Sequence, residues 1–350
     1  MKYPEFLSSQ SCIGFPAPSF GASTEPWKTR FTKALEVLRK EGFLPLPGTN
    51  AFRGDGVGIS NTPLHCAGEL TAMYCDGDID GFISVGGGEL MCEILNYVDF
   101  NRIMDSTPKW FMGYSDNTNF TFLLNTICDI ASIYGPCAAA FCENPRPKYI
   151  QDALDLITGK KLEFKSYLEW EKESKVDAEH PLETFNPKED RVHVIYYDGE
   201  LYKDARETDL NFSITGRVIG GCMDCLQTLV GTRFDKVSDF NKKYVQDGFI
   251  WVLESCDLNV FAQRRAMWQF ENAGWFSNVK GFVFGRPYNG ETMMNLDKYE
   301  AVLEVARHYK VPVIMDADIG HYDPMIPVMM GSVAEFSVKQ NEMTVKYMMK

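Results

Sequence analysis

The chain has 350 residues, of which 45% are hydrophobic and 24% are charged. This composition excludes a disordered, collagen-like or low-complexity chain, and the length predicts two domains or one large α/β unit. The formal net charge of −13 disfavours nucleic acid and anionic membrane surfaces as partners, because their phosphate groups repel an acidic protein.

Two features of the sequence predict a cytoplasmic location. The N-terminus, MKYPEFLSSQ, has no apolar core of a signal peptide, and no uncharged stretch approaches the roughly 20 residues of a membrane-spanning helix. The ten cysteines therefore fit free thiols in a reducing compartment better than a disulfide framework.

The first half of the chain predicts alternating strands and helices. Apolar residues with the spacing of one helical face occur at Phe31, Ala34, Leu35 and Leu38, and Gly42 is placed to end that helix. The further predicted elements are a strand at 43–46, a helix at 63–74, a strand at 81–85, a helix with its apolar face between 90 and 98, a strand at 110–112 and a helix with its apolar face between 120 and 127. This order predicts a parallel sheet covered by helices.

Periodicity is lost between about residues 163 and 210, which we interpret as a linker followed by a long, charged excursion. The last third regains order. Its predicted elements are a strand at 249–253, a helix at 264–273, a strand at 281–284, a helix at 299–309, a strand at 311–315 and a closing hairpin of 333–338 with 343–347.

The predicted architecture is therefore an α/β fold with two domains. We expect an N-terminal parallel-sheet domain with flanking helices at residues 1–165, and a linker with the long excursion at 166–212. A smaller C-terminal α/β domain, with more antiparallel pairing, is expected at residues 213–350.

The sharpest local feature is the segment Gly113-Tyr114-Ser115-Asp116-Asn117, between a predicted strand and a predicted helix. A serine on such a tight turn exposes its Oγ, and the N–H groups at the helix start favour an oxyanion beside it. Ser115 is thus a candidate nucleophile. The alternative is that Ser115 or Asp116 caps the helix, which both residue types do well.

A nucleophilic serine needs a base and a group that orients the base. His321 differs from the other four histidines because it lies in a loop just past a predicted strand, and Glu254 ends the apolar run GFIWVL. Taken singly, His321 also fits a surface loop and Glu254 a solvated strand end. Together with Ser115, however, both follow the carboxyl ends of predicted strands, and these ends converge on the ligand-binding edge of α/β sheets.

Three other patterns in the sequence could indicate a ligand site or a reactive group. Asp316, Asp318 and His321 offer oxygen and nitrogen ligands to a metal, but no second cluster completes a site, so we expect no metal or other cofactor. The turn Gly86-Gly87-Gly88 lacks the spacing of a dinucleotide site, and it either donates an N–H to an oxyanion hole or packs a strand against a helix. The single C-x-x-C pair, Cys222 and Cys225, is expected in the core or at a helix start.

The segment Gly113–Thr118 resembles the G-x-S-D-x-T nucleophile motif of the serine LD-carboxypeptidases and microcin C immunity proteins. The resemblance extends nearly from end to end of the chain. It includes Ala17-Pro18-Ser19, Gly86-Gly87, Tyr134-Gly135-Pro136, Ile219-Gly220-Gly221, Leu253-Glu254 and Gly320-His321.

This resemblance implies a catalytic triad on Ser115, Glu254 and His321, with an oxyanion hole formed by the Asp116 N–H and by Gly87. It also implies a homodimer of two-domain subunits. The chain departs from the family at Ser255, where Asp is frequent, and at Cys222, where Asn is common. The long segment 163–210 makes the chain similar to the immunity-protein branch.

These expectations predict a metal-free serine carboxypeptidase that hydrolyses an amide bond of a small peptide. The substrate is either the L-to-D bond of a murein tetrapeptide or the amide between a peptidyl aspartate and a nucleotide phosphoramidate. In the second case Trp170, Tyr196 and Tyr197 would stack on the nucleobase, unless they serve ordinary packing. A non-catalytic small-ligand-binding protein of the same fold and a metal hydrolase stay open as alternatives.

Overall fold

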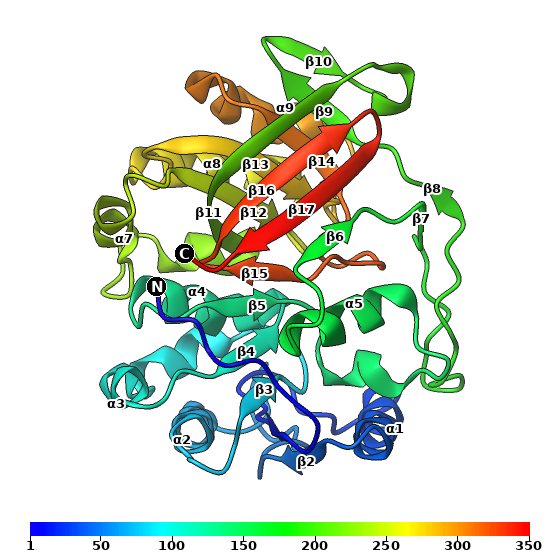
Figure 1. Ribbon diagram of the computed structural model, residues 1–350, viewed down its shortest axis with the longest axis vertical. Coiled ribbons are helices and arrows are strands. Elements are labelled where there is room, and N and C mark those ends of the chain that lie inside the picture. The colour runs from blue at the N-terminus through cyan, green and yellow to red at the C-terminus, as the bar shows by residue number, and fades with distance from the viewer. The chain divides into compact units, whose positions relative to one another are not determined.

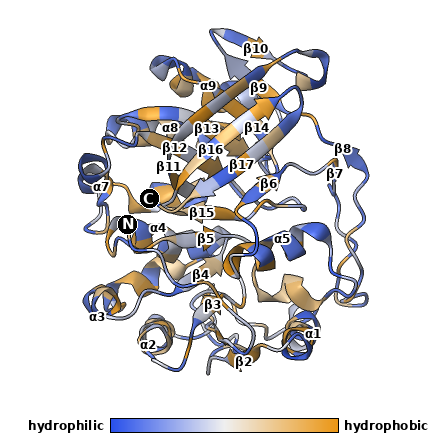
Figure 2. Ribbon diagram, in the orientation of Figure 1, coloured by the Kyte–Doolittle hydropathy of each residue, from blue (hydrophilic) through white to orange (hydrophobic).

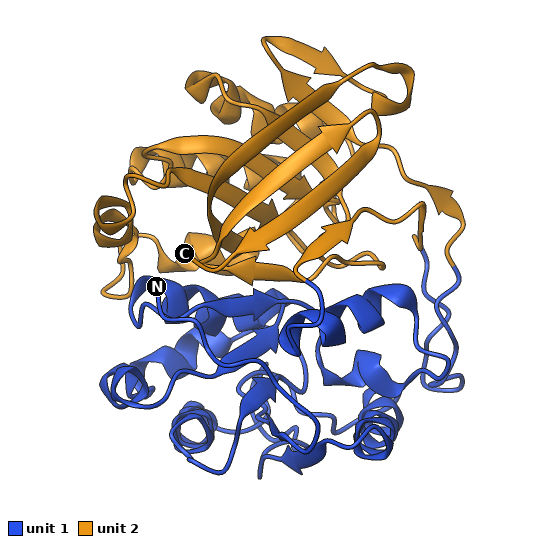
Figure 3. Cartoon of the chain, in the orientation of Figure 1, with its two compact units in different colours: residues 1–161, 173–186 blue, residues 162–172, 187–350 orange.

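The computed structural model describes residues 1–350 and divides into two compact units, coloured separately in Figure 3. Unit 1 comprises residues 1–161 and 173–186, and unit 2 comprises residues 162–172 and 187–350. The two units take equal shares of the chain. The domain limits at residues 165 and 212 stay predictions.

Unit 1 contains five strands that pair in parallel in the order β5-β4-β3-β1-β2 (Figure 1). They are β1 (Cys12–Phe15), β2 (Leu44–Pro47), β3 (Gly81–Ile83), β4 (Trp110–Gly113) and β5 (Ser132–Tyr134). Because all five run the same way, their carboxyl ends share one edge of the sheet. The glycine turn follows β3 at this edge, and Ser115 follows β4.

Four helical segments of unit 1 occur where helices were predicted. They are α1 (Trp27–Lys40), α2 (Pro63–Tyr74), η1 (Met91–Asn96) and α4 (Thr118–Thr126). The unit also contains α3 (Phe100–Asp105), η2 (Ser115–Asn117), η3 (Ala138–Cys142) and α5 (Lys148–Ile157), which were not predicted. Helix α1 buries its predicted apolar face and ends before Gly42, whose φ is 92°. The helix predicted around residues 90–98 is instead the 3₁₀ helix η1, of only six residues.

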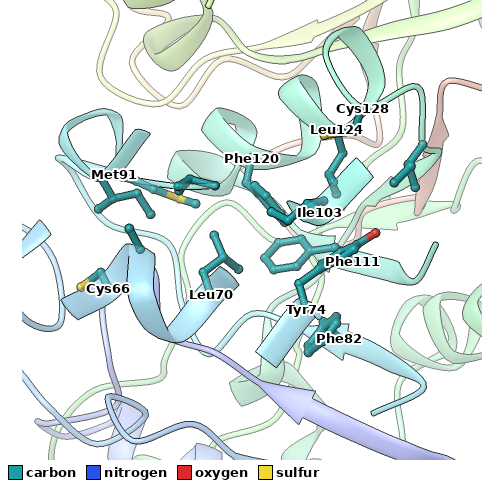
Figure 4. Close-up of a cluster of buried hydrophobic side chains, with 14 of the residues drawn as sticks. Cys66, Leu70, Tyr74, Phe82, Met91, Ile103, Phe111, Phe120, Leu124 and Cys128 are labelled. Carbon is teal, nitrogen blue, oxygen red and sulfur yellow. The ribbon is translucent and has the colours of Figure 1, made fainter. Parts of the chain in front are cut away.

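Aromatic side chains form much of the core that holds β4 and α4 in place (Figure 4). The rings of Phe111 on β4 and Phe120 on α4 meet edge to face with their centroids 4.9 Å apart, and Tyr74 stacks on Phe82 at 5.5 Å. All four side chains are buried. The strand and the helix that flank Ser115 are therefore fixed by packing on both sides of the turn.

Unit 2 is built on a nine-stranded sheet in the order β10-β9-β14-β13-β12-β11-β16-β17-β6. Its strands are β6 (Glu163–Lys165), β9 (Val194–Tyr197), β10 (Glu200–Tyr202), β11 (Asn211–Cys222), β12 (Phe249–Glu254), β13 (Val279–Gly285), β14 (Val313–Ala317), β16 (Val333–Lys339) and β17 (Glu342–Met348). The other elements of the unit are β7 (Glu169–Trp170), β8 (Glu189–Asp190), η4 (Ala205–Glu207), α6 (Met223–Leu229), α7 (Val237–Lys243), α8 (Val260–Asn272), α9 (Lys298–Ala306), η5 (Arg307–Tyr309) and β15 (Val328–Met330).

Parallel and antiparallel pairing divide this sheet. Strands β11, β12, β13 and β14 are parallel, whereas β9, β10, β16, β17 and β6 pair antiparallel. The predicted closing hairpin is formed by β16 and β17, and the predicted antiparallel character of this half is confirmed. Glu254 ends β12 and His321 follows β14 at the carboxyl edge of the parallel part.

The segment predicted as an irregular excursion is more ordered than expected. Phe164 of β6 pairs with Val345, and Tyr196 of β9 pairs with Val313, so strands from this segment extend the sheet of unit 2 at both ends. The stretch around β7 and β8 is largely hydrophilic (Figure 2). None of the helices in the structure is long and apolar enough to cross a membrane.

Candidate active site

Ser115 begins the short turn η2 that joins β4 to α4. Its φ is 61°, in the left-handed region that few residues other than glycine adopt. Its backbone N–H donates to the Tyr134 hydroxyl at 3.1 Å. A helix-capping serine has an extended backbone, and no side chain caps either η2 or α4. The conformation of Ser115 is therefore that of a strained strand-to-helix turn and not that of a cap.

The Asp116 carboxylate is buried and organises the turn. It accepts hydrogen bonds from Ser19 Oγ at 2.6 Å and from the Met91 N–H at 2.9 Å, both on Oδ2, and from Asn119 Nδ2 at 2.9 Å on Oδ1. These donors come from the segment after β1, from η1 and from α4. The carboxylate thus ties three segments together, which the sequence motif alone did not reveal.

Gly87 lies against Ser115. A Cβ on Gly87 would be 3.1 Å from Ser115 Cβ and 3.3 Å from its Oγ, so only glycine permits this close approach without a shift. Asn117, which replaces the second glycine of the usual motif, donates from Nδ2 to the Gly86 carbonyl at 2.9 Å and to the Tyr114 carbonyl at 3.1 Å. Asn117 therefore links the glycine turn to the turn of the serine.

Glu254 and His321 form a hydrogen-bonded pair within unit 2. His321 Nδ1 and Glu254 Oε2 are 2.8 Å apart, and the Glu254 side chain is fully buried. Gly320, with φ 108°, is required at this contact, because a Cβ there would be 2.6 Å from the same carboxylate oxygen. The pair leaves the Nε2 side of the imidazole as the position from which His321 can act on a reacting group.

The environment of His321 favours its charged form. Burial lowers the pKa of His321, but the attraction of the Glu254 carboxylate and side-chain hydrogen bonds with Cys256 and Glu254 outweigh it. The pKa of His321 therefore lies well above its ordinary value of 6.5. An imidazole in this setting is a strong acceptor for a proton released by a nucleophile.

The carboxylates considered as metal ligands have other partners. Asp316 accepts from Lys298 Nζ at 2.6 Å and from the Tyr299 hydroxyl at 2.7 Å. Asp318 forms an ion pair with Arg286 at 2.7 Å and also accepts from the Tyr167 N–H at 2.7 Å. These contacts hold the loop that carries His321, and no group of three or more His, Cys, Asp or Glu side chains is arranged to hold a metal.

Two aromatic side chains of unit 2 contact Tyr322, the residue that follows His321. Tyr322 meets Trp170 edge to face at 5.0 Å and Tyr288 at 5.0 Å, and Arg286 lies over the Trp170 ring. Tyr288 is 55% exposed. In contrast, Tyr197 stacks on Phe212 at 4.5 Å, which favours the packing role for that residue.

The cysteine pair lies at a helix start, as expected. Cys222 precedes α6 and Cys225 lies in its first turn, and both are buried free thiols. Burial raises the pKa of the Cys222 thiol well above its ordinary value, with Cys225 and Glu254 adding to the effect. Cys222 pairs in register with Glu254 across β11 and β12.

The structure thus groups the predicted site residues within each unit. Ser115, Asp116 and Gly87 lie together in unit 1, and Glu254 and His321 lie together in unit 2. The two carbonyl partners of Asn117 could not be seen in the sequence. The sequence shows Gly320 beside His321, but the reason why this position requires glycine, the close approach of the Glu254 carboxylate, appears only in the structure.

Two family models match the chain. The LD-carboxypeptidase N-terminal domain matches residues 13–135, and the LD-carboxypeptidase C-terminal domain matches residues 215–336. Ser115 lies in the first range and Glu254 and His321 in the second. Both matches fall on the chain in the order that the family has.

Curated relatives span almost the whole chain. A predicted carboxypeptidase of Vibrio cholerae serotype O1 is 24% identical over 338 residues, covering 95% of this chain and 93% of the relative. A predicted carboxypeptidase of Streptomyces coelicolor is 23% identical over 350 residues, covering 97% of this chain and 95% of the relative.

Solved structures share the fold. The microcin C7 self-immunity protein MccF in complex with aspartyl sulfamoyl adenosine is 21% identical, with a TM-score of 0.80 and 99% of both chains covered. An MccF-like protein from Bacillus anthracis strain Ames is 20% identical, with a TM-score of 0.80 and complete coverage of both chains. At this level of identity the likeness establishes the architecture, including the predicted α/β fold class.

Proposed function

This chain belongs to the LD-carboxypeptidase family, and on that premise we propose that it is a serine carboxypeptidase acting on an amide bond of a small peptide substrate. We assign Ser115 as the nucleophile, His321 as the general base and Glu254 as the group that orients the imidazole. The observation that carries this proposal is the left-handed backbone of Ser115 between β4 and α4. Capping does not require such strain, whereas an exposed nucleophile on a sharp turn does.

The proposed reaction has two halves. Ser115 Oγ attacks the scissile carbonyl carbon while His321 accepts the hydroxyl proton, and a tetrahedral intermediate forms. The C–N bond then breaks as His321 passes that proton to the leaving amine, which leaves an ester on Ser115. Water next attacks the ester with His321 as the base, and the bond to Oγ breaks as His321 returns a proton to Oγ, so that the carboxylic acid product is released and the serine is restored. Glu254 stabilises the imidazolium in both halves, in keeping with the raised pKa of His321.

The negative charge of each tetrahedral intermediate needs hydrogen-bond donors. We assign this task to the backbone N–H groups of Asp116 and Gly87. The close approach of Gly87 to Ser115 supports the assignment, and the Gly87 peptide is held by the Phe20 N–H, which donates to the Gly87 carbonyl at 2.8 Å. The buried bonds of the Asp116 carboxylate hold its own backbone in place.

For the substrate we favour a peptidyl nucleotide, in which the amide joins an acidic residue to a nucleotide group. The support is the aromatic group of Trp170, Tyr288 and Tyr322, which includes the residue after His321, since the exposed ring of Tyr288 can stack on a planar base. MccF, which shares the fold, has been solved with aspartyl sulfamoyl adenosine. The second candidate substrate is a murein tetrapeptide, from which the same chemistry would release D-alanine.

The test is to incubate the purified protein with both substrates and to identify the products by mass spectrometry. We expect cleavage of the peptidyl nucleotide, its loss by at least 1,000-fold in Ser115→Ala, and full activity in Ser9→Ala, a control at an exposed serine. Turnover that survives in Ser115→Ala would overturn the assignment. Binding without cleavage of either substrate would support the non-catalytic alternative instead.

We further propose that the enzyme works as a homodimer in the cytoplasm. All ten cysteines are free thiols, which suits a reducing compartment. For a homodimer, light scattering should give twice the chain mass of 39.7 kDa. A mass of one chain at micromolar concentration would contradict the dimer.

A further inference from the structure

Asp316, near the end of β14, has a strained backbone. Its φ is 56°, in the left-handed region, although it is not a glycine. Its buried carboxylate accepts hydrogen bonds from Lys298 Nζ at 2.6 Å and from the Tyr299 hydroxyl at 2.7 Å. Such strain persists only where surrounding contacts hold it, and it is concentrated at functional sites.

Lys298, the partner of Asp316, is itself placed at an electrostatic cost. It occupies the first position of α9, directly after the capping residue Asp297, where the helix dipole disfavours a positive charge. Its ammonium group nevertheless turns to Asp316 to form an ion pair at 2.6 Å. Neither residue of this pair is placed where local helix or strand preferences would put it.

A small cavity is lined both by this ion pair and by Glu254, the proposed orienting group of the triad. Its volume is about 20 Å³, and its lining includes Glu254, Ser255, Lys298, Tyr299 and Asp316. This volume accommodates about one water molecule. Lys298 and Asp316 therefore line the same small cavity as Glu254, and at this partly buried position their charges are screened less than in bulk solvent.

We infer that Lys298 and Asp316 are positioning residues for the Glu254–His321 pair. The positive charge of Lys298 partly offsets the negative charge of Glu254 that His321 experiences. Asp316 balances the lysine charge, so that His321 stays basic enough to accept the serine proton. This inference rests on the proposed role of His321 as the general base, and it adds a charge-balancing pair to the residues of the site.

Other ionisable groups surround the same pair of residues. Cys256 bonds to His321, Cys222 lies beside Glu254, and Arg286 and Asp297 act on Tyr299. All of them are left unchanged in the variants proposed here. A difference between variants can then be assigned to the charges of Lys298 and Asp316.

Removing the charge of either member of the pair should shift the pKa of His321, in opposite directions for the two residues. Asp316→Asn keeps a residue type that tolerates the left-handed backbone but leaves the lysine charge unbalanced, so the pKa of His321 should fall. Lys298→Met leaves the aspartate charge unbalanced, so the pKa of His321 should rise. Each shift should be about half a pH unit or more, and the double variant should return close to the parent.

Two measurements separate this inference from the proposed function. The acidic limb of the pH profile of kcat/KM reports His321 in the active enzyme, and NMR titration of labelled histidine reports it without any turnover. Glu36→Gln, which breaks the exposed Lys33–Glu36 pair, is the matched control and should shift neither. Shifts in the same direction, or none, in folded variants would overturn the inference. An inactive parent with the expected NMR shifts would overturn only the proposed function.

Discussion

Gly320 touches the carboxylate of Glu254. A Cβ at residue 320 would lie 2.6 Å from Oε2, the oxygen bonded to His321 Nδ1, and the φ of 108° also disfavours a side chain. We expect Gly320→Ala to displace the carboxylate or the loop of His321. Because misplacement by about 1 Å can cost roughly 100-fold in rate, kcat/KM should fall by about that factor.

The control for this prediction is Gly199→Ala. Gly199 has φ 86°, but nothing lies within 4 Å of its Cβ position, so it shares the backbone strain without the contact. Both variants should lose about 1 kcal/mol of unfolding free energy from strain, measured by urea denaturation. Only Gly320→Ala should lose activity. Equal kcat/KM in the two variants would show that the contact with Glu254 does not matter.

Strain at Ser115 predicts an unusual order of stabilities. Glycine adopts a φ of 61° without the steric cost that alanine has, so Ser115→Gly should be more stable than Ser115→Ala by about 1 kcal/mol. Both variants lack the hydroxyl and should be inactive. Urea denaturation of the two proteins measures the difference. A more stable alanine variant would mean that residue 115 does not keep this conformation in solution.

The raised pKa of His321 predicts the pH dependence of activity. The base must be neutral to accept the serine proton, so kcat/KM should rise with pH through a midpoint above 6.5. In Glu254→Gln the attraction is lost and burial dominates, so the midpoint should fall, while kcat/KM at the optimum drops at least 100-fold. pH profiles of both proteins test this. A midpoint that stays in place in Glu254→Gln would contradict the coupling.

The buried His193 side chain should make unit 2 less stable as the pH is lowered. Burial, with Arg286 and Arg191 adding to it, lowers the pKa of His193 to about 3, and neither ring nitrogen has a hydrogen-bond partner. Between about pH 6.5 and 3 the unfolded chain therefore binds a proton that the folded chain does not. Stability should fall by about 2 kcal/mol between pH 7 and 5 on this account alone.

His193→Leu should remove that part of the pH dependence, as measured by urea denaturation at the two pH values. His308→Leu, at a histidine whose side chain is 58% exposed, should leave the dependence as in the parent. The same loss of stability in the parent and in His193→Leu would show that His193 does not stay neutral in the folded protein.

Local patterns were enough to predict the elements that carry the site. The apolar spacing of α1 and the continuous apolar run of β12 could be recognised in the sequence because the buried residues of each element form a pattern within that element. Strand β6 was missed for the opposite reason. Phe164 finds its partner at Val345, and no local pattern records a pairing that distant.

The residues of the candidate site likewise divide into those that local patterns indicate and those that only the fold brings together. Ser115, Glu254 and His321 were selected because each follows a strand that could be predicted. Lys298 was not, because nothing in the local sequence shows which residue a lysine at a helix start will contact, and its ion pair with Asp316 joins residues that are 18 positions apart. Residues that position a site through space are therefore found last.

The central claim is that His321 activates Ser115, and labelling with a fluorophosphonate tests it most directly. Mass spectrometry should place the label on Ser115 alone, at a rate that falls at least 100-fold in His321→Gln, with urea denaturation confirming that the variant is folded. Labelling of Ser115 at the same rate in the parent and in His321→Gln, or no labelling of Ser115 in the parent, would contradict it.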